Sequence, residues 1–244
     1  MDPIINWYSK RLLIPTNERV TKQPVRYQTF YMRDTLKKAP KYLIFIDLET
    51  NGVATPLLIN GKYNYEQLPT IKQLSMLIIE RNLYMEKISL SLDDFTVYDF
   101  KTTYTPLFYI NKILQILEQY SDSIIIAHNG MAFDFKIIAA NILKYKKRYN
   151  TSELKFYDSM IAAKSAIKAV YSYKNCDLLL HCPIDKYDYI NNLLVNVHDA
   201  VTDCYITATW MHNYKNSLNF DQYSSFNACI KQWSSQFYKY KPKN

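Results

Sequence analysis

Four carboxylates and one histidine are spaced along this chain in a way that favours metal-dependent chemistry. The set comprises Asp47, Glu49, Asp134, His198 and Asp203. The first two are separated by Leu48, and residues i and i+2 of an extended strand point to the same face. Carboxylates that converge on one point raise each other's pKa values, a cost that divalent cations remove. Oxygen ligands favour Mg²⁺ or Mn²⁺, and two ions about 4 Å apart can stabilise the attacking and leaving oxygens of a phosphodiester.

Each acid of this set lies at the end of a segment with clear periodicity. The apolar run Tyr42–Asp47 is typical of a buried central strand, and Ser123–Ala127 predicts a second one. An apolar stripe over residues 133–147 predicts a helix that Asp134 opens. A last helix is expected to begin near Asp199 and to carry Asp203 in its first turn.

Other segments complete the predicted fold. Strands are expected at Gln73–Glu80, Phe95–Lys101 and Leu154–Tyr157, and helices around residues 110–117 and from an N-cap at Asp158 through Val170. Three strands followed by alternating strands and helices predict an α/β fold, with a mixed five-stranded sheet flanked by helices.

Taken singly, each acid has a structural explanation. Asp47 fits a turn at a strand end, Asp134 a helix N-cap and Asp203 a solvated helix residue. Together, in this order and on these elements, they favour a metal-dependent active site.

Charge is concentrated at the two ends of the chain. Its 244 residues carry a net charge of +8, of which residues 1–41 hold +6 and residues 214–244 hold +4, while residues 42–213 hold −2. We therefore predict a basic N-terminal extension (1–41), a catalytic domain (42–213) and a basic, aromatic C-terminal extension (214–244). Such ends suit an anionic polymer, although they also fit a purely solubilising role or, at the C-terminus, rings that pack on the domain.

Composition excludes several classes of protein. Only three glycines are present, which excludes Gly-rich nucleotide-binding loops. No apolar run reaches the length of about 18 residues that a membrane span needs, and the N-terminus has no signal layout, so we expect an intracellular protein, cytoplasmic or nuclear, that is neither secreted nor membrane-bound. A zinc site at Cys176, His181 and Cys182 lacks a fourth ligand at regular spacing, which favours buried thiols.

Three motifs built on the acid set resemble a known family. They are Ile46-Asp47-Leu48-Glu49-Thr50, His128-Asn129-Gly130-Met131-Ala132-Phe133-Asp134 and His198-Asp199-Ala200-Val201-Thr202-Asp203. The chain resembles the DEDDh (DnaQ-like) 3′–5′ exonucleases over residues 41–213, and with Tyr157-Asp158-Ser159 it looks most like the three-prime repair exonuclease (TREX) branch. The resemblance implies a ribonuclease H-like fold. A proline-rich loop and a membrane anchor known in parts of that branch are not found, so its dimerisation and anchoring are not transferred.

The resemblance also implies roles for the set. Asp47 would bridge two Mg²⁺ or Mn²⁺ ions, with Glu49 and Asp203 completing the first site and Asp134 holding the second ion. His198 would act as general base, because an imidazole can accept a proton near neutral pH.

Five further residues would line the 3′ end of the substrate. They are Leu48, Val53, Phe133 and, more weakly, His128 and Asn129. Core packing or loop stabilisation explains the last four equally well.

The predicted function is 3′–5′ exonucleolytic hydrolysis of single-stranded or frayed DNA to 5′-mononucleotides. Two alternatives stay open: a 3′–5′ exoribonuclease, and a non-catalytic nucleic-acid-binding module or polymerase accessory that works through the basic ends. The extensions also leave open a protein partner or a dimer.

Overall fold

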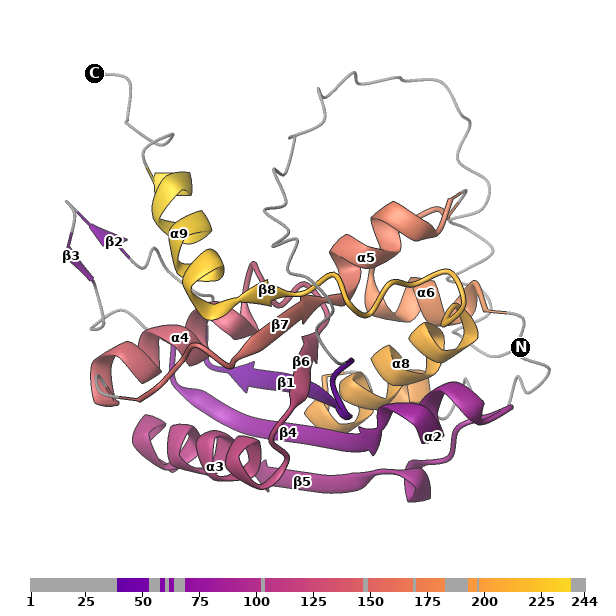
Figure 1. The fold of residues 1–244 in the computed structure, drawn as a ribbon, viewed down its shortest axis with the longest axis horizontal. Helices are drawn as coiled ribbons and strands as arrows, with labels where there is room; N and C mark the ends of the chain where they lie inside the picture. Colours follow the sequence, from indigo (N-terminus) through magenta and orange to yellow (C-terminus); the bar gives the residue numbers. More distant parts are fainter. Residues whose placement is uncertain are drawn as a thin grey trace.

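A computed structural model describes most of the chain beyond the N-terminal segment (Figure 1). The described residues are 39–52, 58–59, 62–63, 69–101, 104–146, 149–168, 170–182, 193–196 and 198–237, with side chains up to residue 231. All of the predicted N-terminal extension except residues 39–41, and the last part of the C-terminal one, lie outside them.

One mixed sheet forms the centre of the fold. Its strands, in spatial order, are β5 (Thr96–Lys101), β4 (Ile71–Glu80), β1 (Tyr42–Thr50), β6 (Ser123–Ala127), β7 (Lys155–Asp158) and β8 (Ser224–Ser225). The pairs β5–β4, β4–β1 and β7–β8 are antiparallel, while β1–β6 and β6–β7 are parallel. Two short strands, β2 (Leu58–Ile59) and β3 (Lys62–Tyr63), form a separate antiparallel pair.

The predicted ribonuclease H-like mixed sheet flanked by helices is confirmed, with one addition. The five expected strands are all present, and β8 adds a sixth beside β7. The sequence of β8 is only Ser-Ser, which carries no apolar alternation, so periodicity could not reveal it.

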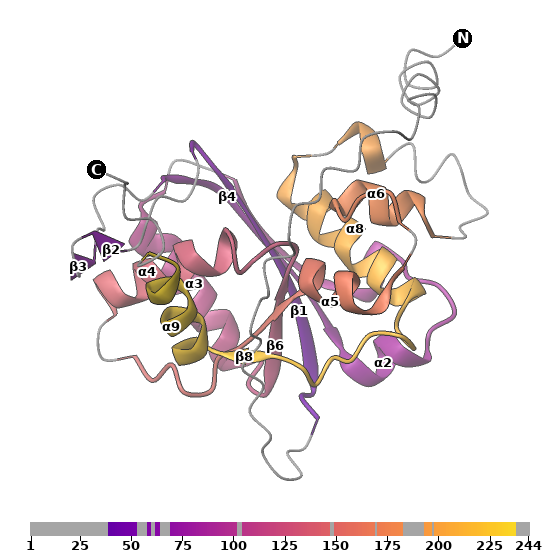
Figure 2. The same ribbon diagram turned by 90° about the horizontal axis from the view of Figure 1, so that it is seen from above.

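Helices cover both faces of the sheet (Figure 2). One face carries α3 (Pro106–Gln119), α4 (Asp134–Tyr145) and α9 (Phe226–Phe237). The other carries α2 (Arg81–Glu86), α5 (Ser159–Ala166), α6 (Asn175–Leu180) and α8 (Ala200–Asn213). A 3₁₀ turn, η1 (Leu92–Asp94), precedes β5. Each face buries its own apolar cluster.

Helix boundaries differ from expectation at two places. The helix capped by Asp158 ends at Ala166 rather than Val170, because Ile167 has an extended backbone and its N–H closes the last turn on Ala163. The helix at Asp199 is not the last, since α9 follows β8 and places Phe226 and Cys229 in the core. The predicted C-terminal extension thus contributes β8 and the start of α9 to the fold.

Within the described residues, no helix is both long enough and apolar enough to cross a bilayer.

Candidate active site

The strand β1 brings two carboxylates to the face of the sheet covered by α8. Alternation along the strand puts Leu43 and Phe45 in the apolar cluster under α8, whereas Ile44 and Ile46 pack on the opposite face. Asp47 and Glu49 share the parity of Leu43 and Phe45, so they extend that row towards α8.

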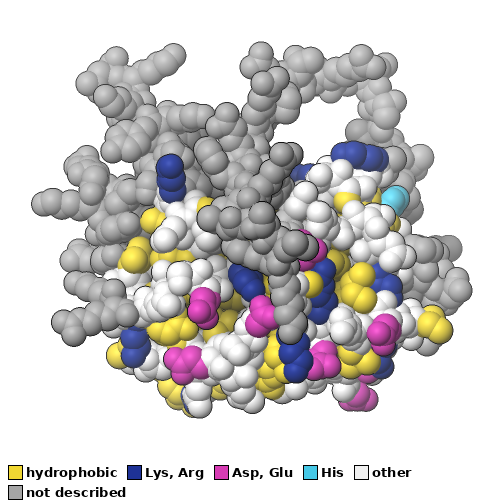
Figure 3. Space-filling model, in the orientation of Figure 1, with side chains coloured by type: hydrophobic (Ala, Val, Ile, Leu, Met, Phe, Trp, Pro, Cys, Tyr) yellow, Lys and Arg dark blue, Asp and Glu magenta, His cyan; other side chains and the backbone are white. Residues whose placement is uncertain are grey.

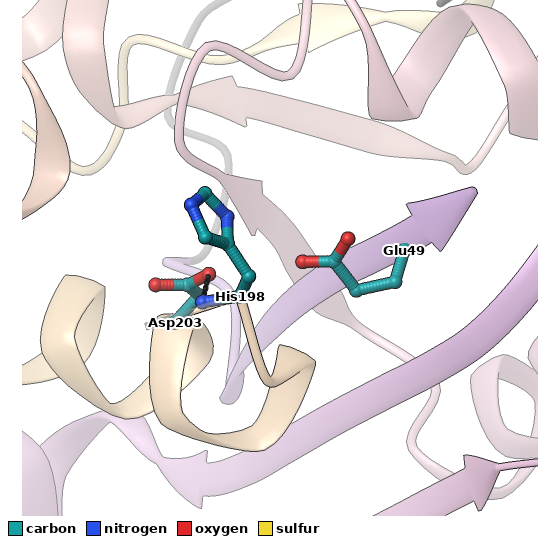
Figure 4. A group of neighbouring side chains, drawn as sticks. All are labelled: Glu49, His198 and Asp203. Atoms are coloured by element: carbon teal, nitrogen blue, oxygen red, sulfur yellow. Dashed lines mark hydrogen bonds between the residues drawn. The ribbon is translucent and has the colours of Figure 1, made fainter. Parts of the chain in front are cut away.

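The start of α8 supplies the facing side chains (Figure 4). Ligand atoms of Glu49, His198 and Asp203 all lie within 4.8 Å of one another. The backbone N–H of His198 donates to Asp203 Oδ2 at 3.2 Å. His198 has φ = 76°, a left-handed conformation that is uncommon for a residue with a side chain, and it is exposed. Figure 4 shows the imidazole and both carboxylates around one space.

A tight turn at the end of β6 delivers the fourth carboxylate. Asp134 begins α4, is only 2% exposed and accepts a hydrogen bond from the Leu48 N–H at 3.1 Å. The turn needs Gly130, because a Cβ there would lie 2.7 Å from both Ala127 Cβ and a ring carbon of Phe135. This close packing fixes Asp134 against the C-terminal part of β1, at Leu48.

The four acids interact electrostatically. Burial raises the pKa of Asp47 well above its usual range, and the charges of Asp134, Asp203 and Glu49 raise it further. Burial also raises the pKa of Glu49 and of Asp203, and raises that of Asp134 to about 8. Because every carboxyl disfavours its charged form here, a bound divalent cation would relieve the repulsion. The carboxylate oxygens of this set fit Mg²⁺ or Mn²⁺.

A polar network that sequence reasoning missed holds the start of α8. Gln73 on β4 accepts a hydrogen bond from Ala200 N–H at 3.3 Å and donates to Asp199 at 3.1 Å and to Asp99 at 2.8 Å. Asp199 caps α8 and forms an ion pair with Lys101 at 2.5 Å. The residue next to His198 is therefore tied to β4 and β5.

A second missed residue is Asn175, the first of α6. Its Nδ2 donates to the carbonyl oxygen of Asp203 at 3.0 Å, while its Oδ1 accepts from Thr207 at 3.0 Å and from the Trp210 indole at 2.9 Å. Every polar atom of this amide except one N–H is engaged with α8, which fixes α6 beside the carboxylates. Neither Gln73 nor Asn175 gives a signal in a single sequence, since isolated amides are common.

Four of the five residues predicted to line the 3′ end of the substrate lie within the described part of the chain. Leu48 is buried in the core, and Phe133 is half-buried against it. Asn129 is half-buried with φ = 62°. The ring of His128 donates from Nε2 to the Tyr173 carbonyl at 3.0 Å, which leaves Nδ1 to accept from the Ser159 hydroxyl at 3.0 Å.

Their roles in substrate binding stay predictions. The fifth residue, Val53, lies outside the described residues. Cys176, Cys182 and His181 do not form a metal-binding cluster in the described part of the chain, where both cysteines are free.

No protein-family model and no curated protein sequence matches the chain. Among solved structures, it is similar to E. coli exonuclease I. A zinc-bound complex with single-stranded DNA is 14% identical, with a TM-score of 0.49, over 72% of this chain and 41% of that chain. A second structure, of exonuclease I and how it achieves processivity, is 13% identical, with a TM-score of 0.49, over 81% of this chain and 43% of that chain. The chain thus spans less than half the length of these exonuclease I chains.

Proposed function

We propose that the protein is a DEDDh-type 3′–5′ exonuclease that hydrolyses single-stranded or frayed DNA ends to 5′-mononucleotides. The proposal rests on one observation: Glu49, His198 and Asp203 offer ligand atoms within 4.8 Å of one another, beside the electrostatically coupled Asp47 and Asp134. A protein with no use for a cation gains nothing from gathering four carboxylates whose charges destabilise one another.

The carboxylates would hold two Mg²⁺ or Mn²⁺ ions. Asp47, Glu49 and Asp203 would bind the first, and Asp134 with Asp47 the second. Such ions neutralise charge on the phosphate and act as Lewis acids. Asp47 and Glu49 are fixed by the sheet, and Asp134 by its hydrogen bond from Leu48, so the ligands are already oriented before substrate binds.

His198 would remove a proton from the attacking water. Its imidazole is exposed on the left-handed turn just ahead of α8, and its own backbone N–H bonds to Asp203. The ring is therefore free to meet solvent and substrate while its backbone stays attached to the carboxylate cluster. General bases of this kind contribute a factor of about 10² to 10⁴ to the rate.

A gel assay with a 5′-labelled DNA 20-mer and Mg²⁺ tests the proposal. We expect a ladder that shortens stepwise, stops at a phosphorothioate linkage near the 3′ end and vanishes in EDTA. Asp47→Asn and His198→Ala should each reduce the rate at least about 100-fold. Glu118→Gln, an exposed acid on α3 at the opposite face, is the matched control and should cleave normally.

Three outcomes would contradict the proposal. Undiminished digestion by both site variants would exclude the carboxylate site, and salt-sensitive binding with no cleavage would favour the non-catalytic binding module. Faster shortening of an RNA 20-mer of the same sequence would assign the activity to an exoribonuclease instead.

A further inference from the structure

A surface beside the site differs in charge from the domain around it. Between Asp158 and Asp177 the chain carries three lysines and no acid, although residues 42–213 as a whole have a net charge of −2. We call the group Lys164, Lys168, Tyr171 and Lys174 the α5–α6 surface. All four side chains are exposed, and Tyr171 is 88% exposed. In the orientation of Figure 1, Figure 3 shows dark-blue Lys or Arg side chains over α5.

These groups are unused within the described part of the chain. The three lysines form no ion pair there, although Lys164 interacts electrostatically with Asp158, and the one hydrogen bond, from Lys168 Nζ to the carbonyl oxygen of Lys164, brings no negative charge. Tyr171 has neither a hydrogen bond nor a ring contact with described residues. A tyrosine ring so fully exposed loses the burial that normally stabilises it, and exposed rings of this kind are enriched where a partner binds.

The segment that carries Tyr171 is anchored to the carboxylate site at its far end. The carbonyl oxygen of Tyr173 accepts from His128, which directly follows β6, and the Tyr173 hydroxyl donates to Ile167 at 2.9 Å, which closes the loop on itself. Lys174 immediately precedes Asn175, which donates to the backbone of Asp203. The surface therefore has a fixed position relative to the proposed metal ligands.

We propose that the α5–α6 surface binds the single strand several nucleotides from its 3′ end, with the lysines on phosphates and Tyr171 stacked on a base. This inference rests on the proposed function, because it assigns the path of the same substrate. A flexible anionic polymer with flat bases matches the surface: ammonium groups pair with phosphates, and an exposed ring stacks on any base without sequence preference. Only a strand longer than the few nucleotides held at the carboxylates would reach it.

Chain length is the variable that tests the proposal. The full-length protein is given a DNA 15-mer and a dinucleotide, and kcat/KM is measured for each with Mg²⁺. Binding of the fluorescein-labelled 15-mer is measured by anisotropy in EDTA, without cleavage, between 50 and 200 mM salt. The variants are Tyr171→Ala, Tyr171→Phe and the double variant Lys168→Gln/Lys174→Gln. Lys112→Gln/Lys144→Gln, on helices of the opposite face, is the charge-matched control.

We expect effects on the long substrate alone. Tyr171→Ala should weaken binding of the 15-mer and lower its kcat/KM by about tenfold, whereas Tyr171→Phe keeps the stacking ring and stays near wild type. The double-lysine variant should reduce the slope of log Kd against log salt by about 1.4, at about 0.7 per phosphate contact in a single strand. Cleavage of the dinucleotide should not change.

Equal losses on the dinucleotide and the 15-mer would overturn the proposal, as would an unchanged 15-mer or a control that behaves like the double-lysine variant. A wild-type protein that cleaves neither substrate would reject the exonuclease function. The anisotropy series would still report on the surface, so the two failures can be told apart.

Discussion

The two helices that carry site carboxylates, α4 and α8, hold them by different means. Helix α4 begins without a side-chain cap. Its first residue, Asp134, is buried and is fixed by apolar packing around Gly130 and by one hydrogen bond from the backbone N–H of Leu48. Asp203 in α8 is half-buried and follows a helix start that is capped by Asp199 and bonded to Gln73. The position of Asp134 thus depends mainly on close packing, and that of Asp203 on a polar network that joins α8 to the sheet.

This difference has a practical meaning. Substitutions that disturb packing should damage the α4 side together with the whole fold. Substitutions in the polar network should change the α8 side while the fold persists. Four predictions test this difference between α4 and α8, in order from the largest expected effect to the smallest.

Gly130→Val should be the most damaging change. Its Cβ would meet Ala127 and the Phe135 ring at 2.7 Å, too close for any side chain. Overpacking of this kind costs about 3 kcal/mol, which corresponds to a fall in Tm of about 10 °C in a domain of this size. Calorimetry checks it, with Gly52→Ala as control, because among the described residues a Cβ there meets only Pro69, at 3.9 Å. A valine variant as stable as wild type would refute packing as the support for Asp134.

The second prediction concerns pH in the absence of metal. The pKa of Asp134 is raised from an unfolded value near 3.8 to about 8, so the folded state binds more protons and its stability falls as pH rises from about 4 to about 8. In EDTA, wild-type Tm should drop over this range by at least about 5 °C more than that of Asp134→Asn, and Mg²⁺ should reverse the drop.

His128 also titrates in this range, in both the wild type and Asp134→Asn, so its contribution cancels when the two Tm curves are compared. Burial lowers the pKa of His128 to about 4, so stability falls as pH drops from about 6.5 to about 4. Parallel Tm curves for wild type and Asp134→Asn would contradict the second prediction.

Gln73→Leu should separate activity from stability. It removes the acceptor for Ala200 and the donor to Asp199 and Asp99, so the start of α8 loses its hydrogen bonds to Gln73 on β4 and keeps the ion pair of Asp199 with Lys101 on β5. Because misplacing a catalytic group by about 1 Å can cost 100-fold, we expect kcat to fall at least about tenfold with KM little changed. Gln115→Leu, on the exposed side of α3, is the matched control. A kcat within twofold of wild type would show that α8 needs no such link.

Lys101→Gln should have the smallest effect. The ion pair with Asp199 is partly exposed, with 57% of the lysine side chain accessible, so it contributes little and is screened by salt. Steady-state kinetics should give a kcat/KM about two- to threefold below wild type at 50 mM salt and equal to it at 500 mM. A difference that persists at high salt would mean that Lys101 acts by more than charge.

Sequence alone predicted the buried strands best. Ser123–Ala127 is observed with the expected bounds, because a short apolar run between a turn and His128-Asn129-Gly130 has few other conformations. The N-cap role of Asp158 is also confirmed, since its side chain accepts from Ile161 N–H. These features depend on neighbouring residues, which a single sequence displays.

Features set by distant partners could not be predicted. The network of Gln73, Asp99 and Asp199 joins positions 26 to 126 residues apart, and no periodicity marks it. Asp158 also accepts from Met131 N–H, which supports the turn before α4, but only its local cap was visible in sequence. The convergence of the acids was inferred from their order and their elements.

The pairing of β7 with β8 also sets a sequence of events during synthesis. Phe156 on β7 packs against Phe226, which directly follows β8, yet roughly 65 residues separate the two strands. At 5–20 residues per second, a ribosome needs on the order of 3–13 s to make that stretch. All the proposed metal ligands are translated before β8, so the part of the sheet that carries them emerges while the edge of β7 is still unpaired. An unpaired strand edge can bind a chaperone or a neighbouring nascent chain until β8 covers it.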